Sequence, residues 1–430
     1  MLDRSRPPTA PGVSRRTFLR TGTLVGAAIG LESGLAAAAT AAGTPAPRIR
    51  RRVTLGRTGV EVPDIGFGTF SLGETAPRED EALIHHALDR GITHFDTAEG
   101  YTKGRAEEVL GRALRGRRHE VTITSKFWAN PEDSAERQMQ ALEESLRKLG
   151  TDYVDLYLNH AVNDIERLSS AEWQAFTERA KRQGKIRHVG MSGHATRLGE
   201  CVEYALDHGL VDVLLVAYNF AQQPSFKDNL KQYLNDWLPS LDIVTAQPRL
   251  PALLARAHAE GVGVMVMKTL KGARLNDMRA FEGPGRTFAQ AAFRWVLSEP
   301  SVDALVVSMT SREQIDEYVA ASGSGDPDRE DLALLARYVA RTADSTCVVG
   351  CGTCAGSCPA GVPIAEVLRT RMYALDYGLP GIAAREYATL ERGAEACLGC
   401  SGAPCASACP AGVPIAELAR DTARRLGRSG

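Results

Sequence analysis

The chain has 430 residues, of which 44% are hydrophobic and 24% are charged, and its formal net charge is -1. This length predicts two or three domains, and the composition is ordinary for a soluble globular protein. The near-neutral charge, with no basic block through the middle of the chain, excludes an electrostatic case for nucleic-acid binding.

The first forty residues predict an export signal. The run SRRTFLR at residues 14–20 has the twin-arginine pattern, which directs proteins that fold before they cross the membrane. The apolar stretch from Leu24 to Ala39 is interrupted by Glu32 and Ser33, so it is too short and too polar for a permanent span. We expect a signal peptide over residues 1–42 and a protein exported to the periplasm or the cell exterior. The alternative is a cytoplasmic protein whose signal is not used.

Short apolar runs alternate with longer amphipathic ones over residues 52–322. The segments between the short runs, such as Glu79–Arg90, Glu132–Leu149 and Ser170–Arg182, have helical length and pattern. This alternation predicts an α/β fold, a (β/α)₈ TIM barrel, because the G-x-G-x-x-G turn typical of open doubly wound sheets is missing. The expected strands are Ile65–Thr69, Ile92–Asp96, Val121–Ser125, Val154–Leu158, Arg187–Met191, Val213–Ala217, Val262–Met267 and Leu305–Val307.

Four polar residues follow or end three neighbouring strands of this barrel, where barrel active sites are built. Asp96 and Tyr101 follow the second strand, Lys126 the third and His160 the fourth. The set fits carbonyl reduction: Tyr101 would donate a proton, and Lys126 would lower its pKa. Asp96 would hold Lys126, and His160 would orient the carbonyl oxygen. Each residue alone more often caps a helix or packs, but their joint position at one rim favours catalysis.

The motifs around these residues resemble those of the aldo/keto reductase family. The resemblance covers residues 52–320 and includes DTA-x-x-Y at 96–101, TSK at 124–126, LNH at 158–160 and GFGTF at 66–70. It implies an oxidoreductase that interconverts a carbonyl and an alcohol with NAD or NADP, bound in extended form across the barrel mouth. It also implies cofactor contacts from Gly68, Thr69 and Phe70 at the nicotinamide, Ser192 at its carboxamide, Lys268, Leu270 and Lys271 at the diphosphate, and Ser308 and Gln314 after the eighth strand.

Several positions depart from the family pattern. Leu215 stands where the family usually has a Gln for the carboxamide, and Met267 where an aromatic residue often stacks on the nicotinamide. Ser308 and Gln314 stand where members that grip the 2′-phosphate of NADP have Lys and Arg, although Arg312 is nearby. We therefore expect no strong preference for NADP over NAD.

A Ser-, Gly- and Pro-rich link and a helix expected over Glu330–Arg341 form a linker at residues 323–345. Eight of the nine cysteines follow it, in two runs that both continue into the sequence PAGVPIAE, at 359–366 and 410–417. This is an internal duplication, and its spacing approximates the ferredoxin run in which the fourth Cys precedes Pro and ligates the other [4Fe–4S] cluster. We expect a small α-helical ferredoxin-like domain over residues 346–425 with two clusters. The expected ligands are Cys347, Cys351, Cys354, Cys358, Cys397, Cys400, Cys405 and Cys409.

Zinc and disulfide bonds are the competing interpretations of these cysteines. Zinc sites do not need the Cys-Pro ending, whereas disulfides suit an exported protein with an even cysteine count. A subset of aldo/keto reductases is similar in carrying a C-terminal ferredoxin-like extension. The leading hypothesis is thus a redox enzyme for a small carbonyl or alcohol, with clusters that exchange electrons with a partner. The alternative is an electron-transfer or redox-sensing protein whose barrel is a binding scaffold.

Overall fold

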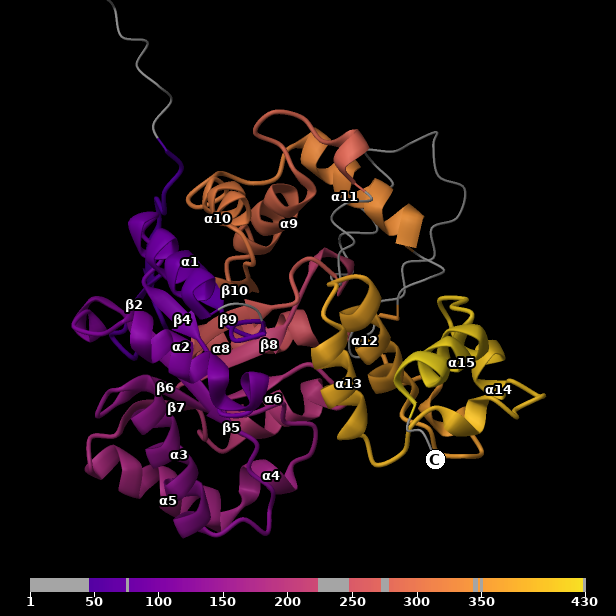
Figure 1. Ribbon diagram of the computed structural model, residues 1–430, viewed down its shortest axis with the longest axis horizontal. Helices are drawn as coiled ribbons and strands as arrows, with labels where there is room; N and C mark the ends of the chain where they lie inside the picture. Colours follow the sequence, from indigo (N-terminus) through magenta and orange to yellow (C-terminus); the bar gives the residue numbers. More distant parts are fainter. Residues whose placement is uncertain are drawn as a thin grey trace, which may run out of the picture. The chain divides into compact units, whose positions relative to one another are not determined.

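The computed structural model describes residues 46–74, 77–222, 247–271, 278–342, 347–348 and 351–427. Eight parallel strands form a closed barrel, as the alternating pattern predicted (Figure 1). The strands follow one another around the barrel in chain order, and the last pairs with the first. The export signal expected over residues 1–42 lies outside the described residues. The barrel strands are β3 Ile65–Gly68, β4 His94–Asp96, β5 Thr122–Phe127, β6 Val154–Asn159, β7 Ile186–Gly193, β8 Val213–Ala217, β9 Gly263–Met267 and β10 Ala304–Ser308.

Helices connect the barrel strands. They are α1 Pro77–Asp89, α2 Arg105–Ala113, α3 Ala135–Leu149, α4 Glu166–Ser169, α5 Ala171–Arg182, α6 Leu198–Asp207, α8 Leu250–Ala259, α9 Phe288–Leu297 and α10 Arg312–Val319, with 3₁₀ turns η1 Tyr101–Gly104, η2 Arg118–Glu120, η3 Phe220–Gln222 and η5 Arg279–Phe281. Ser134, Ser170 and Thr287 cap α3, α5 and α9 by accepting a hydrogen bond from a backbone N–H that the helix leaves unpaired. None of the helices in the described part of the chain has the length and apolarity that a membrane crossing requires.

A β-hairpin before the first barrel strand closes one end of the barrel. Its strands, β1 (Arg52–Thr54) and β2 (Glu61–Pro63), pair antiparallel. Leu55 and Val62 are fully buried with the inward-facing side chains of the barrel. A Cβ on Gly263, the first residue of β9, would fall 2.9 Å from the Cβ of Leu55, so the hairpin covers the end at which the strands begin. Strands of three residues are too short for their alternation to stand out in the sequence.

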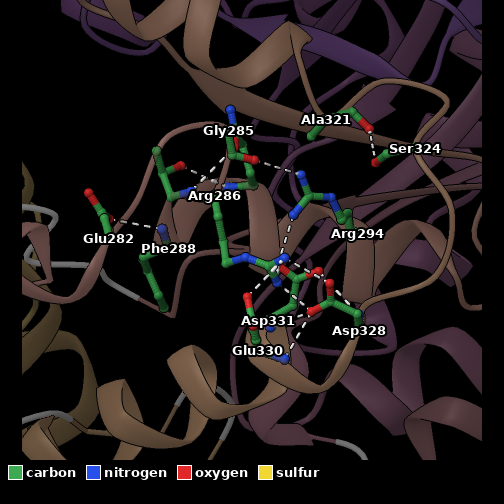
Figure 2. A network of polar contacts seen from close by, with 12 residues as sticks. Glu282, Gly285, Arg286, Phe288, Arg294, Ala321, Ser324, Asp328, Glu330 and Asp331 are labelled. Carbon is green, nitrogen blue, oxygen red and sulfur yellow. Dashed lines mark hydrogen bonds and ion pairs between the residues drawn. The ribbon is translucent and has the colours of Figure 1, made fainter.

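The helix predicted in the linker is present as α11 (Arg329–Thr342), and ion pairs hold it against α9 and the loop before α9. Figure 2 shows this network. The buried carboxylate of Asp331 accepts hydrogen bonds from Arg294 at 2.8 Å and from Arg286 at 3.3 Å, and Asp328 also pairs with Arg286. A buried carboxylate needs such partners to remain charged. The network therefore fixes the last element before the cysteines onto the barrel.

The cysteine module has a hydrophobic core of its own, although it belongs to the same compact unit as the barrel. Its elements are α12 Ile364–Leu375, α13 Pro380–Ala388, α14 Pro404–Ser407 and α15 Ile415–Leu426, with 3₁₀ turns η6 Ala355–Ser357 and η7 Glu395–Cys397. Pro363 and Pro414 precede α12 and α15 with similar backbone angles, φ -75 and ψ 77 against φ -73 and ψ 63. Val362 and Val413 are both buried in this core. The duplication seen in the sequence is thus a duplication of structure as well.

Candidate active site

The four predicted catalytic residues meet at the end of the barrel where the strands finish. Asp96 ends β4, and Lys126 lies in β5. His160 follows β6 directly, and Tyr101 begins η1. Lys126 Nζ donates hydrogen bonds to Asp96 Oδ1 at 2.6 Å, to the carbonyl of Thr97 at 2.7 Å and to Tyr101 Oη at 3.4 Å. The rings of Tyr101 and His160 lie edge to face with their centroids 5.6 Å apart.

Asp96 and Lys126 form a buried ion pair, with side chains 5% and 1% exposed. Burial lowers the pKa of Lys126, and the Asp96 carboxylate offsets part of that effect. Burial also raises the pKa of Asp96, which the Lys126 ammonium opposes. Removing either partner would leave an uncompensated buried charge, so each keeps the other ionised. The contact expected between the two residues is therefore present.

Tyr101 has a pKa raised well above its ordinary value. Burial is the largest cause, and the charge of Asp96 and the phenol of Tyr373 add to it. The expected net lowering by Lys126 is not seen, because burial outweighs the effect of its ammonium on the phenol. The Lys126 charge is already compensated by Asp96 at 2.6 Å, and its Nζ lies farther from the phenol, at 3.4 Å. Tyr101 is accordingly protonated at neutral pH, the form that a proton donor requires.

His160 has a pKa lowered well below its ordinary value. Burial is the largest cause, followed by the positive charges of Lys126, Arg167 and Arg369. Trp128 and Tyr101 flank the ring. A neutral imidazole carries one N–H donor and one acceptor nitrogen. His160 can therefore hydrogen-bond a carbonyl oxygen without transferring its own proton.

Arg167 fixes the backbone around His160, and no motif in the sequence singled it out. Its buried guanidinium donates to three main-chain carbonyls, among them His160 at 2.7 Å and Ala161 at 3.1 Å, and to Asn159 Oδ1 at 2.8 Å. Burial lowers the pKa of Arg167 to about 10, so the side chain stays charged at neutral pH. Ala161 has a left-handed φ of 52°, which is strained for alanine, and its N–H donates to Ser192 Oγ at 3.0 Å. Arg167 thus holds a strained turn that links His160 to Ser192.

The residues that the family resemblance assigns to the nicotinamide cofactor border one large cavity of about 1840 Å³, into which Asp96, Tyr101, Lys126 and His160 also face. The cofactor candidates that line it are Gly68, Phe70, Ser192, Lys268, Leu270, Ser308 and Gln314. Thr69 and Lys271 are buried and do not belong to the lining residues. The structure therefore brings seven of the nine candidates to the cavity surface and leaves two beneath it.

The positions that depart from the family pattern remain distinct in the structure. Leu215 is buried inside the barrel, whereas Met267 lines the cavity. Gln314 uses its side-chain oxygen to accept hydrogen bonds from the N–H and the hydroxyl of Thr310, at 2.8 and 3.0 Å. Ser308 and Gln314 thus offer a hydroxyl and an amide group to the cavity where a cation was the family expectation.

Residues of the cysteine module complete the cavity wall, and the sequence did not indicate this. Tyr373 on α12 is 6% exposed and packs against Phe70 with ring centroids 5.3 Å apart. Its hydroxyl accepts hydrogen bonds from Lys268 Nζ at 3.3 Å and from Arg369 Nη1 at 3.0 Å. Burial alone would raise the pKa of Tyr373, but the charges of Lys268 and Arg369 bring it below the ordinary value.

All nine cysteines are described, and their thiols are free. Most electrostatic interactions among the eight C-terminal thiols fall within two sets, although Cys354 also interacts with Cys405 across them. The first set is Cys347, Cys351, Cys354 and Cys409, and the second is Cys358, Cys397, Cys400 and Cys405. The last cysteine of each run therefore lies with the first three of the other run. Within the described ranges, no three or more His, Cys, Asp or Glu side chains are grouped so that they could hold a metal ion.

Comparison with known proteins shows the family. The model of the aldo/keto reductase family matches residues 64–336, more than half of the chain, and the chain belongs to this family of NAD(P)-dependent oxidoreductases. It is 26% identical to an uncharacterized oxidoreductase of Bacillus subtilis, over 66% of this chain and 95% of the relative. It is 27% identical to L-glyceraldehyde 3-phosphate reductase of Escherichia coli, over 66% of this chain and 91% of the relative. The solved aldo-keto reductase from Klebsiella pneumoniae in complex with NADPH is 28% identical with a TM-score of 0.51, over 67% of this chain and 95% of that one.

Proposed function

We propose that this chain interconverts a small aldehyde or ketone and its alcohol, by hydride exchange with a nicotinamide nucleotide at the barrel mouth. The observation that carries the proposal is the contact of buried Lys126 Nζ with both Asp96 and Tyr101, beside His160. These groups face a cavity large enough for a nucleotide and a substrate together.

Each residue of the site has a separate role in the proposed reduction. A bound nucleotide supplies the hydride that adds to the carbonyl carbon. Tyr101 Oη gives its proton to the carbonyl oxygen, and the Lys126 ammonium stabilises the phenolate that remains. Asp96 keeps Lys126 charged, and neutral His160 orients the carbonyl oxygen through a hydrogen bond. Phe70, Ser192 and Lys268 are the wall residues that would hold the nucleotide.

The Tyr101→Phe variant tests this assignment. The ring and its packing on Phe70 at 5.2 Å remain, so folding and nucleotide binding should persist. Loss of the proton donor should lower kcat by about 10²- to 10⁴-fold. Tyr204→Phe is the matched control, because Tyr204 lies on α6 outside the cavity and stacks on His208. Steady-state reduction of a panel of aldehydes and ketones measures the effect, and a Tyr101→Phe rate close to wild type would refute the role.

The nucleotide preference follows from the cavity wall after β10. Ser308 and Gln314 place no positive charge there, so the 2′-phosphate of NADP gains little and we propose weak discrimination between NADH and NADPH. The relative from Klebsiella pneumoniae was solved with NADPH, which supports at least this nucleotide. Steady-state rates of reduction with NADH and with NADPH test this preference. A much higher rate with NADPH would contradict the assignment of these two positions.

We further propose that the two cysteine sets hold two [4Fe–4S] clusters that pass single electrons. The exchange of the fourth cysteine between the two runs supports this, because ferredoxin runs share their ligands in that way. The thiolates of a cluster surround a core of iron and sulfide, so they stand farther apart than the ligands of one ion. Absorbance near about 400 nm that dithionite bleaches, with iron and acid-labile sulfide, tests the proposal. Colourless protein purified without air would refute it.

The twin-arginine run supports a third proposal, export of the folded and loaded protein. Changing Arg15 and Arg16 to Lys should retain the protein in the cytoplasm. Fractionation of cells, with the size of the mature chain, measures the outcome. Full-length wild-type protein confined to the cytosol would refute export.

A further inference from the structure

The helices α12 and α13 lie against the barrel mouth, next to the residues that would hold the nucleotide (Figure 1). Tyr373 on α12 packs on Phe70, which follows β3. Its hydroxyl also accepts a hydrogen bond from Lys268, which follows β9. Ahead of α12, Gly352 lies against Thr196 after β7, where a Cβ on Gly352 would fall 2.9 Å from Thr196 Cγ2. The module therefore reaches three of the loops that form the rim.

A separate contact fastens α13 to the same rim. Arg385 forms an ion pair with Glu74, which lies in the loop after β3, and the two side chains are only 29% and 16% exposed. Gly381 on the same helix is close enough that a Cβ there would fall 3.0 Å from Glu74 Oε2. A charge-assisted hydrogen bond that is partly shielded from water is stronger than an exposed surface pair. This ion pair connects α13 to the barrel through a contact that does not involve Tyr373.

A small apolar cluster lies between the contacts of Tyr373 and the ion pair of Arg385 with Glu74. Tyr373, Ile382 and Ala383 are buried together, and Phe70 from the barrel packs against this small cluster. Phe70 is the residue expected at the nicotinamide end of the nucleotide, and Lys268 lies on the expected diphosphate side. Tyr373 contacts both, so it lies along the expected path between the nicotinamide and the diphosphate.

We infer that α12 and α13 form a strap that retains a nicotinamide dinucleotide in the barrel as a resident cofactor, with Tyr373 as the main contact over it. The inference rests on the proposed function. The cavity of about 1840 Å³ exceeds the roughly 300–1,000 Å³ of ordinary small-molecule pockets, so an extended dinucleotide has room beneath the strap. The dinucleotide leaves only when the strap opens, whereas a small carbonyl compound needs a narrower opening.

The rate at which bound nucleotide leaves the full-length protein tests the strap. Purified protein is analysed for co-purified nucleotide, and the loss of NADPH fluorescence is followed after an excess of NADP is added. Glu74→Ala removes the tie to Arg385 and should raise the release rate by about 10-fold or more, the worth of one charge-assisted bond. Glu81→Ala is the matched control, because it breaks an ion pair with Arg112 on the outer helices and should leave the rate unchanged.

Two variants of Tyr373 separate its hydroxyl from its ring. Tyr373→Phe removes the hydrogen bonds and should speed release by several-fold, and Tyr373→Ala also removes the ring and should speed it further. Circular dichroism establishes whether each variant is folded. If Tyr373→Ala does not fold, Tyr373→Phe and Glu74→Ala still test the inference.

Three outcomes would each overturn the inference. They are release of the nucleotide from wild type within seconds, release rates that the variants leave unchanged, and slower release from Tyr373→Ala. The last result would mean that Tyr373 competes with the nucleotide. In all three cases the nucleotide still binds, so the proposed reductase function stands. A protein that binds neither NADH nor NADPH would instead remove the proposed function, and the inference with it.

Discussion

Replacing Arg167 by Met tests whether the geometry of His160 depends on a residue that touches it only through the backbone. The side chain keeps its apolar part, but three carbonyl oxygens and the amide oxygen of Asn159 lose their donor. Arg167→Lys keeps the charge and can reach some of these acceptors. Arg147→Met is the matched control, because Arg147 is exposed and pairs with Glu144 on its own helix.

The expected effects follow from the number of acceptors left behind. Each buried acceptor without a donor costs about 1–3 kcal/mol, less where water enters. Four acceptors lose their donor, so removing the guanidinium should lower the free energy of unfolding by about 4 kcal/mol or more where water does not replace it. The turn at Ala161 is strained, so it should relax and move His160. A displacement near 1 Å in a reacting group costs roughly 10²-fold in rate.

Thermal unfolding and steady-state kinetics measure the two effects separately. We expect Arg167→Met to lose about 10² in kcat, with Arg167→Lys between it and wild type. The KM for the nucleotide should also rise. The N–H of Ala161 donates a hydrogen bond to Ser192, so a shift of this turn should also displace the Ser192 side chain. A folded Arg167→Met protein with wild-type kcat would refute the positioning role, whatever its stability.

Three further predictions use other parts of the molecule. Burial raises the pKa of Glu107 to about 7, so the folded state holds a proton that the unfolded state releases, and stability should fall as pH rises from about 4.5 to 7. Glu107→Gln should flatten that slope in denaturant titrations, and an unchanged slope would contradict the burial account. His160 is neutral over the usual pH range, so kcat/KM should show no ionisation between about pH 5.5 and 8, whereas an acid limb near 6.5 would show that it is not. Cys354→Ser and Cys409→Ser should each remove about half of the iron and yield the same remaining cluster spectrum, because both thiols belong to one set. Cys201→Ser should keep all of it, and two different spectra from the first pair would refute the exchange of ligands.

The barrel and its catalytic set could be predicted because their signals are local. A short apolar run marks each strand, and the residue that ends a parallel strand must reach the common rim of the barrel. Asp96, Lys126 and His160 end or follow three such runs, so their meeting followed from topology alone. The internal duplication was visible for the same reason, because it is written in consecutive residues.

The remaining features depend on contacts between residues far apart in the chain. Tyr373 sits in an ordinary helical segment, and nothing near it in the sequence indicates that it packs on Phe70. Arg167 looks like any arginine of a surface helix until its carbonyl partners are known. The pKa of Tyr101 is raised instead of lowered, because the sequence indicates the nearby cation and its carboxylate partner but not the burial that dominates.

The exchange of cysteines between the two halves of the module makes the module indivisible. Each half of the duplication contributes three thiols to one set and its last thiol to the other, so neither half contains a complete set. A chain that stopped before Cys397 would keep four of the eight C-terminal cysteines and yet contain neither set complete.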